Sequence, residues 1–267
     1  MQVVILCGGQ GTRIRDVADD IPKPMIPVGG RPIVWHIMKS YAQYGYKRFI
    51  LCLGYKSWAI KQYFLNYALA NSDLTVELDC VDAVKVNEPY RIEDWQVTLA
   101  ETGLETQTGG RVKRIQKYLD GDQFLLTYGD GVSDININTL VDFHHRHGKT
   151  ATVTAVKPPG RFGELEIEDG RVVEFQEKPL ATQGLISGGF FVFNRRFVER
   201  LPERDDLFLE RDPLIKLAHE GELAAYVHEG FWHCMDSSRD YHLLNNLWNS
   251  GEAPWNTWSA ERLRRAA

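Results

Sequence analysis

Short apolar runs that end in glycine alternate with segments of helical spacing in the first part of the chain. The runs Val3–Cys7 and Arg48–Leu53 are each followed directly by glycine. In Pro32–Tyr44 and in Ser57–Leu69, apolar residues recur at intervals of three and four. The short runs predict buried strands and the longer periodic segments predict helices. Strand, helix, strand and helix in this order favour βαβ units and a parallel sheet.

The remaining chain continues this alternation around an irregular middle. Residues 74–120 mix short alternating stretches with proline and charges, and a helix is expected at their end, over Arg111–Leu119. The motif Asp169-Gly170, between the alternating stretches 163–167 and 171–175, predicts a β-hairpin. Further strands are expected over 123–128, 150–156, 187–193 and 223–228, and further helices over 137–147, 213–220, 240–248 and 261–265.

This order of elements favours an α/β fold with a mixed, mostly parallel central sheet. The length of 267 residues corresponds to about 1.8 domains at roughly 150 residues per domain. No internal repeat or low-complexity linker divides the chain. We therefore expect a single domain over residues 1–267, with an irregular excursion near 74–120.

The composition excludes several functional classes. Hydrophobic residues make up 43% and charged residues 25% of the chain, which is typical of globular proteins and argues against disorder. The net charge of −5 argues against a nucleic-acid partner, which requires a basic surface. No apolar run reaches about 18 residues, and no basic segment precedes Val3–Cys7, so we expect neither a membrane span nor a signal peptide. The cysteines form no C-x-x-C pair, so the sequence indicates neither a zinc site nor a disulfide framework. We therefore expect a cytoplasmic protein.

A glycine-rich turn follows the first predicted strand. Its sequence, Gly8-Gly9-Gln10-Gly11-Thr12-Arg13, fits neither the Walker A pattern nor G-x-G-x-x-G. Glycines there let backbone N–H groups approach a phosphate, and the arginine adds a planar cation. Lys23 lies between two prolines that favour an extended backbone, which could hold the lysine over the turn. The alternative is an ordinary strand-to-helix turn with a solvated lysine.

Two acidic residues are candidates for a magnesium site. Asp130 follows a predicted strand and Gly129, at the strand end where ligands gather in open α/β sheets. A carboxylate beside phosphates needs a cation between them, and Mg²⁺ takes one or two protein carboxylates together with substrate phosphates. Asp236 is the candidate for the second carboxylate. Asp130 could equally be a turn residue, and Asp236 could equally be the N-cap of the last helix.

Two further segments place a cation beside a strand end or a glycine-rich loop. Glu177-Lys178-Pro179 ends a predicted strand, where the charged residues could bind a phosphate or form a solvated pair. The segment Thr102–Arg111 contains several glycines and leads into a helix with a basic residue. It could be a ligand-binding loop or a plain helix entry.

Four motifs, in the order in which they occur along the chain, resemble those of the sugar-1-phosphate nucleotidyltransferases. The matching parts are an apolar strand, G-G-x-G-T-R and K-P over residues 3–24, Gly129-Asp130, Glu177-Lys178-Pro179 and the late Asp236. The resemblance to the members that use CTP extends almost from end to end. It includes the stretches at 32–39, 52–56, 108–111, 127–133, 158–163, 188–191 and 253–255. It implies a Rossmann-like α/β nucleotidyltransferase sandwich.

The resemblance also implies an activity. CTP and α-D-glucose 1-phosphate would give CDP-glucose and pyrophosphate with Mg²⁺ as cofactor, in polysaccharide biosynthesis, and the protein would be a homo-oligomer. Two alternatives stay open. One is a sister enzyme that uses dTTP or UTP, and the other is a non-catalytic nucleotide-sugar sensor on the same fold.

Residue roles follow from the resemblance position by position. Arg13, Lys23 and Asp130 would be catalytic, and Asp130 and Asp236 would hold the metal. The sugar phosphate would be bound by Lys178, with Glu177 and Gly189 beside it. The nucleotide would be bound by Leu6, Cys7, Gly8, Gly9, Gln10, Gly11, Thr12, Arg13, Lys23, Thr106, Arg111 and Gly129.

The chain departs from the CTP-dependent relatives at three places. Ser187 replaces an asparagine, Phe208 and Leu209 stand where the relatives have a Trp-Glu pair near Glu210, and Ser237-Ser238 replaces Thr-Leu. Ser187 and Phe208 fall in segments expected near the sugar pocket, so they bear on which sugar is accepted.

Overall fold

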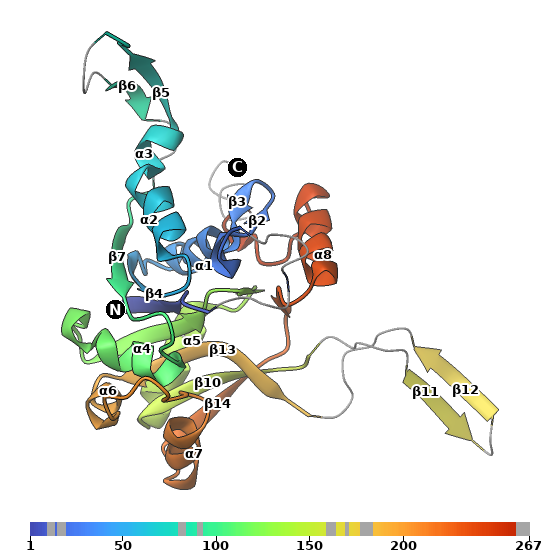
Figure 1. Cartoon of the computed structure of the whole chain (residues 1–267). Helices are drawn as coiled ribbons and strands as arrows, with labels where there is room; N and C mark the ends of the chain where they lie inside the picture. Colours follow the sequence, from blue (N-terminus) through green and yellow to red (C-terminus); the bar gives the residue numbers. More distant parts are fainter. Residues whose placement is uncertain are drawn as a thin grey trace.

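The central element is a seven-stranded sheet in a computed structural model, which describes residues 1–9, 14, 20–79, 84–89, 93–158, 164–168, 171–176 and 184–259 (Figure 1). In spatial order the strands are β14 (Leu223–His228), β10 (Ala151–Val156), β13 (Ile186–Asn194), β8 (Gln123–Tyr128), β1 (Gln2–Leu6), β4 (Arg48–Leu53) and β7 (Gln96–Glu101). Only β13 among these seven runs against its neighbours. The predicted α/β class with a mixed, mostly parallel sheet is confirmed.

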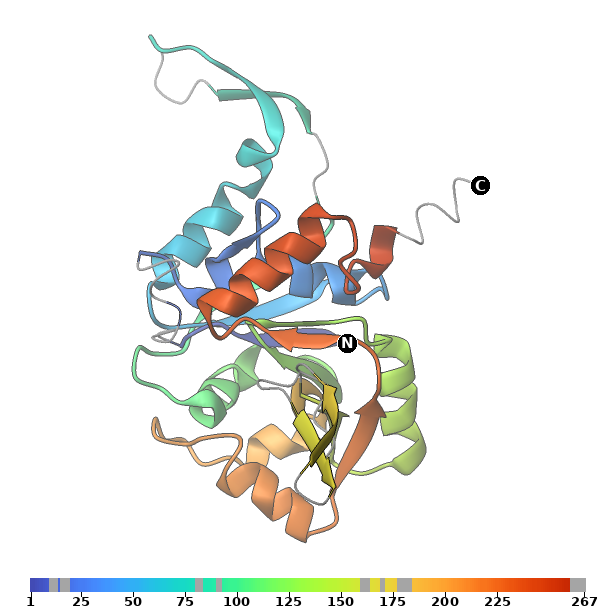
Figure 2. The same ribbon diagram turned by 90° about the vertical axis from the view of Figure 1, so that its right-hand side faces the viewer.

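Helices cover both faces of this sheet (Figure 2). Val3 and Ile5 of β1 belong to one core, whereas Val4 and Leu6 belong to the other, as the alternation of side chains along a strand requires. The first core contains residues of α1 (Ile33–Ala42), α5 (Ile137–His147) and α8 (Ser238–Asn249). The second contains residues of α4 (Thr108–Arg114), α6 (Arg196–Arg200) and α7 (Asp212–His219).

Two hairpins leave this body in different directions (Figure 1). The first lies at the end of a segment that we call the arm, formed by α2 (Ser57–Leu65), α3 (Tyr67–Ala70), β5 (Ser72–Val76) and β6 (Val84–Pro89). The second is formed by β11 (Glu164–Glu168) and β12 (Arg171–Gln176), which pair antiparallel as the Asp169-Gly170 motif predicts. Of the irregular segment 74–120, β7 and α4 belong to the body rather than to the arm.

Several predicted boundaries are wrong for identifiable reasons. The expected single helix over Ser57–Leu69 is broken at Asn66, whose side-chain amide donates to the Gln62 carbonyl and competes with the helix backbone. The expected helix over Arg111–Leu119 begins earlier, at Thr108, and gives way to a 3₁₀ turn, Gln116–Tyr118.

The two glycines at the start of α4 explain why the sequence pattern predicts the beginning of this helix too late. A Cβ at Gly109 would lie 2.8 Å from Leu207 Cγ, and one at Gly110 would lie 2.7 Å from the Arg204 carbonyl oxygen. Tertiary packing therefore needs glycine inside this helix, although glycine disfavours helix formation. The predicted helix over 261–265 lies outside the described residues. In the described part of the chain, no helix is long and apolar enough to span a membrane.

Candidate active site

A pocket of about 420 Å³ opens where β1 and β8 end. These strands are parallel neighbours, so their carboxyl ends meet at one edge of the sheet, the usual ligand site of open α/β folds. The lining residues are Leu6, Cys7, Gly8, Gly9, Ile14, Lys23, Pro24, Leu104, Glu105, Thr106, Gln107, Thr108, Arg111, Tyr128, Gly129, Asp130 and Asp236. The structure thus brings ten of the predicted site residues together around one cavity.

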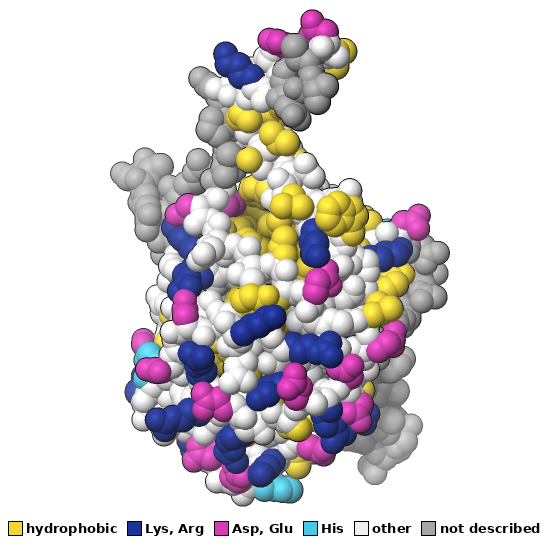
Figure 3. Space-filling view, turned by 60° about the vertical axis from the view of Figure 1, so that its left-hand side comes forward, with side chains coloured by type: hydrophobic (Ala, Val, Ile, Leu, Met, Phe, Trp, Pro, Cys, Tyr) yellow, Lys and Arg dark blue, Asp and Glu magenta, His cyan; other side chains and the backbone are white. Residues whose placement is uncertain are grey.

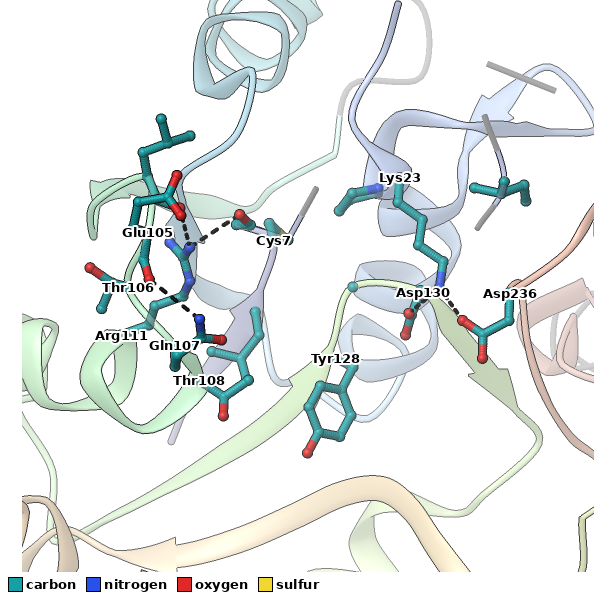
Figure 4. A pocket seen from close by; sticks show the side chains of 17 residues that line it. Cys7, Lys23, Glu105, Thr106, Gln107, Thr108, Arg111, Tyr128, Asp130 and Asp236 are labelled. Atoms are coloured by element: carbon teal, nitrogen blue, oxygen red, sulfur yellow. Dashed lines mark hydrogen bonds and ion pairs between the residues drawn. The ribbon is translucent and has the colours of Figure 1, made fainter. Parts of the chain in front are cut away.

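Lys23 joins the two predicted metal ligands at one end of this pocket (Figure 4). Its Nζ lies 2.6 Å from Asp130 Oδ2 and 2.5 Å from Asp236 Oδ1. Burial favours the neutral amine, but the attraction and hydrogen bonds of the two carboxylates outweigh it and raise the pKa of Lys23. We call these three side chains the charged end of the pocket.

Two short strands bring the carboxylates together. Gly131–Ser133, named β9, follows Asp130 and pairs antiparallel with β15 (Trp232–Cys234), which precedes Asp236. The backbone N–H of Met235 donates to the Asp130 carbonyl oxygen over 2.9 Å, which closes the connection. Neither strand is predicted from the sequence, because segments of three residues carry too little pattern.

The Lys23 backbone is held by its proline neighbours. The extended backbone that the two prolines favour is found at Pro22, but Lys23 itself begins a 3₁₀ turn, Lys23–Met25, in which the Met25 N–H donates to the Pro22 carbonyl. Pro24 packs against Gly129, where a Cβ would lie 3.0 Å from Pro24 Cγ and 2.9 Å from the Leu6 carbonyl oxygen. Gly129 is therefore required by this close approach of the Lys23 turn to the sheet.

The residues at the charged end fit a magnesium ion. Asp130 and Asp236 already share one cation, the Lys23 ammonium, and their oxygens are the hard ligands that Mg²⁺ prefers. In the described ranges, no group of three or more His, Cys, Asp or Glu residues could hold a metal. A site with two carboxylates suits an ion that takes its other ligands from water and substrate phosphates. The N-cap of α8 is Ser237, so the alternative of Asp236 as the cap is wrong.

Arg111 organises the opposite end of the pocket, which we call the loop end (Figure 4). Its guanidinium donates to the carbonyl oxygens of Leu53, Gly103, Gly8 and Leu104 and to the hydroxyl of Thr102, over 2.8 to 3.3 Å. The residue is 4% exposed, and burial lowers its pKa. Arg111 therefore ties the ends of β1 and β4 to the loop 102–107.

Glycines make room for this guanidinium. A Cβ at Gly8 would lie 2.1 Å from Arg111 Nη1, and one at Gly54 would lie 2.6 Å from the same atom. The structural reason for Gly8 is thus the passage of Arg111, in addition to any phosphate contact. Thr106, also 4% exposed, accepts a hydrogen bond from Arg114 Nη1 at 2.9 Å, which fixes the same loop.

Tyr128 lies between the two ends (Figure 4) and shares a hydrogen-bonded group with Thr108 and Glu210, none of which is predicted as a site residue. Tyr128 Oη and Thr108 Oγ1 donate to the two carboxylate oxygens of Glu210 over 2.5 and 2.6 Å. Gly189 lies under the Tyr128 ring with φ of 77°, and a Cβ there would lie 2.4 Å from the ring. The sequence signal for Tyr128 is its place at the end of a buried strand, directly before Gly129.

Some predicted residues lie outside the described part of the chain. They are Gln10, Gly11, Thr12, Arg13, Glu177 and Lys178. Of the departures from the relatives, Ser187 is exposed at the start of β13, and its Oγ accepts a hydrogen bond from Gly189 N over 3.4 Å. Phe208 is half-buried, and the Arg211 guanidinium lies 4.2 Å from its ring.

Comparison with known proteins decides the family. Residues 2–247 match the family described as nucleotidyl transferase. The chain belongs to this family. The resemblance predicted from the motifs is confirmed by two nucleotidyl transferases that match 97% of this chain and 100% of their own length. They are a glucose-1-phosphate cytidylyltransferase of Salmonella typhi, 49% identical, and a probable glucose-1-phosphate cytidylyltransferase of Bacillus subtilis, 43% identical.

Solved structures with the nucleotidyl transferase fold are also similar to this chain. HddC from Yersinia pseudotuberculosis, in complex with GMP-PN, is similar with a TM-score of 0.67 and 25% identity over 92% of this chain and 99% of that one. A putative glucose-1-phosphate thymidylyltransferase from Bacillus anthracis gives a TM-score of 0.63 over 92% of this chain and 94% of that one. Its identity of 18% indicates a shared fold alone.

Proposed function

We propose that this nucleotidyl transferase is a glucose-1-phosphate cytidylyltransferase, which converts CTP and α-D-glucose 1-phosphate into CDP-glucose and pyrophosphate. The observation that carries the proposal is the charged end of the pocket. It combines Lys23 with two carboxylates in a chain that is 49% identical, over 97% of its length, to an enzyme of that name. A cation and a pair of metal ligands beside one cavity are what transfer between phosphates requires.

The reaction forms one bond and breaks another at the α-phosphorus of CTP. An oxygen of the sugar phosphate attacks this phosphorus, and the bond to the leaving pyrophosphate breaks in line. The attacking phosphate needs no general base, because its second pKa is about 6 and it is largely ionised near neutral pH. Catalysis then depends on orientation and on neutralising charge.

The residues of the charged end would supply that neutralisation. Asp130 and Asp236 would hold Mg²⁺, which would offset the negative charge of the nucleotide phosphates when bound. Lys23 would turn from the carboxylates towards the α-phosphate. From the motifs, Arg13 would bind the departing pyrophosphate, and Lys178, with Glu177 and Gly189 nearby, would bind the sugar phosphate.

The loop end would bind the base. Its backbone between Thr102 and Thr106 is held by hydrogen bonds from the side chains of Arg111 and Arg114. A fixed set of peptide N–H and C=O groups can distinguish bases by their hydrogen-bonding edges at little cost in ordering. We therefore place cytosine against this loop, with Leu6, Cys7, Gly8 and Gly9 beneath the nucleotide.

A matrix of substrates tests the proposal. Pyrophosphate release would be measured with CTP, dTTP, UTP and ATP, each with glucose 1-phosphate. The proposal expects CTP to be preferred, whereas a preference for dTTP or UTP would establish the sister activity. Absence of release with all four nucleotides, from protein that binds CTP, would favour the sensor. The same assay with other sugar 1-phosphates would test Ser187 and Phe208.

The proposal includes a homo-oligomer of single-domain chains in the cytoplasm. Apolar side chains gather along the arm and where it leaves the body (Figure 3). Those of the arm that are at least 37% exposed are Trp58, Leu65, Leu69, Leu74, Val76, Leu78, Val84 and Val86. An isolated two-stranded hairpin is marginally stable in water, so a second chain against it would supply stability. Light scattering of the purified protein would give the number of chains, and a monomer would contradict this part.

A further inference from the structure

The loop that carries Asp236 is wrapped around the carboxylate of another residue, Asp240, in the first turn of α8. Asp240 Oδ2 accepts hydrogen bonds from the backbone N–H of Asp236 at 3.1 Å and of Ser237 at 2.8 Å. The same oxygen accepts the Ser237 hydroxyl at 2.8 Å. The other oxygen, Oδ1, lies 2.9 Å from Nε2 of His233, which belongs to β15.

This set of bonds exceeds what a helix start requires. In an ordinary capping box, the third residue of the helix accepts one hydrogen bond, from the backbone N–H of the N-cap. Ser237 and Asp240 form that box. The bonds from Asp236 N–H and from His233 do not belong to it, and they extend the network to the strand before the loop and to the proposed metal ligand.

The network holds Asp236 between two fixed elements. On the side of α8, Asp240 binds the Asp236 backbone. On the side of the sheet, the Met235 N–H donates to the carbonyl of Asp130, so both carboxylates share one backbone frame. His233 is 7% exposed, and its ring orients the Asp240 carboxylate from β15. A rotation of Asp240 would therefore move Asp236 relative to Asp130.

We infer that Asp240, oriented by His233, is a positioning residue that sets the distance between the Asp236 and Asp130 carboxylates for the divalent cation. The inference rests on the proposed function, because it takes the two carboxylates as metal ligands. Groups that orient metal ligands in this way typically change metal affinity by about 10- to 100-fold when they are substituted.

The test compares Asp240→Asn with Asn136→Ala. The Asp240→Asn variant keeps the size of the side chain, but it loses the negative charge, and one of its two acceptor oxygens becomes an amide N–H₂ that can only donate. Asn136 is the N-cap of α5 and accepts a hydrogen bond from Thr139 N at 3.1 Å, so its variant also loses a helix cap, at a different helix. Both variants should lower the Tm by a few degrees. Only Asp240→Asn should affect the response to magnesium.

Two readouts follow that response, one of them independent of turnover. The first is the Mg²⁺ concentration that gives half-maximal pyrophosphate release at saturating CTP and glucose 1-phosphate. The second is the Mg²⁺ concentration at which the rise in Tm with CTP is half-complete, without sugar phosphate. We expect both to increase about tenfold in Asp240→Asn and to stay within about twofold of the wild type in Asn136→Ala.

Further variants separate this inference from the proposed function. His233→Ala removes the outer hydrogen bond and leaves the Asp240 carboxylate in place, so it should shift both readouts in the same direction, by about threefold, even if Asp240→Asn does not fold. Asp236→Asn should abolish the Mg²⁺-dependent rise in Tm. If Asp236→Asn does so while Asp240→Asn and His233→Ala behave like Asn136→Ala, the inference is overturned and the metal assignment stands. If Asp236→Asn has no effect, the assignment fails, and the inference fails with it.

Discussion

Each end of the pocket contains a cation, buried at the loop end and half-buried at the charged end, but the two ends use it in opposite ways. At the loop end, the guanidinium of Arg111 makes its hydrogen bonds to backbone carbonyls and one hydroxyl. At the charged end, Lys23 binds two carboxylates, and the side chains of Asp130 and Asp236 stay 28% and 31% exposed. The first cation holds protein to protein, whereas the second occupies a place that another cation could take.

This difference separates a preformed part of the site from an exchangeable one. Neutral carbonyls around a buried arginine gain little from a ligand, because removing the arginine would leave them unsatisfied. Two carboxylates that share one ammonium retain a negative charge, which favours exchange for a divalent ion. We therefore expect substitutions at the charged end to reduce turnover, and substitutions at the loop end to reduce nucleotide affinity and stability.

The largest expected effect is that of Asp130→Asn. Loss of one metal ligand should lower kcat by about 10³-fold, at the upper end of what one charge-stabilising group contributes. Pyrophosphate release at saturating substrates measures it. The Tm should change little, because Lys23 keeps its ion pair with Asp236. A variant with near wild-type turnover would remove the distinction between the two ends.

Lys23→Met should have the next largest effect, because it should lower kcat but raise the affinity for a divalent cation. The variant loses the charge proposed to meet the α-phosphate, so kcat should fall about 10²-fold. Without nucleotide, however, it should bind Mn²⁺ about tenfold more tightly, because no ammonium competes for the carboxylates. Titration calorimetry with Mn²⁺ measures this affinity. If the affinity for Mn²⁺ decreases instead, Lys23 does not occupy the position of the metal.

Arg111→Lys tests the loop end. A lysine ammonium has three donors, so it cannot satisfy all five acceptors that the guanidinium reaches. We expect a loss of about 2 kcal/mol in the free energy of unfolding and an increase of about tenfold in KM for CTP. Denaturant titration and initial rates measure the two quantities.

A matched arginine-to-lysine variant at the surface shows whether the effect of Arg111→Lys depends on the burial of the arginine. Arg48 pairs with Asp120 at the surface, where its side chain is 46% exposed. Arg48→Lys should change stability by less than about 0.5 kcal/mol and leave KM unchanged. If Arg111→Lys lowered kcat more strongly than it raised KM, the loop end would take part in the chemistry rather than in binding alone.

The same contrast explains how much the sequence could predict. Lys23 and Asp130 stand next to strand ends, turns and prolines, so their positions follow from local pattern and from the order of motifs. That Asp236 meets Asp130 depends on β9 and β15, which are too short to leave a periodic signal. The residue types at the charged end are therefore predictable from the sequence, whereas the contacts that bring these residues together are not.

The role of Arg111 depends on packing that no local pattern carries. The glycine at position 8 suggests a phosphate-binding turn, whereas a Cβ there would collide with the Arg111 guanidinium from α4. The fold class is predictable because strand alternation and helix spacing persist over many residues. A buried arginine that joins three segments leaves no such pattern, since each of its partners is a backbone group or a common hydroxyl.

Tyr128→Phe should give the smallest effect, because Tyr128 lies between the two ends and belongs to neither. The variant keeps the ring that packs on Gly189 and loses only the hydrogen bond to Glu210, which Thr108 still holds. We expect KM for CTP to rise about threefold and stability to fall by about 1 kcal/mol. Tyr118→Phe, at an exposed tyrosine of the surface, is the matched control. If turnover instead decreased by about 10²-fold or more, the scale of one catalytic contact, the Tyr128 hydroxyl would have to reach the substrate. The loop end and the charged end would then form one continuous catalytic surface.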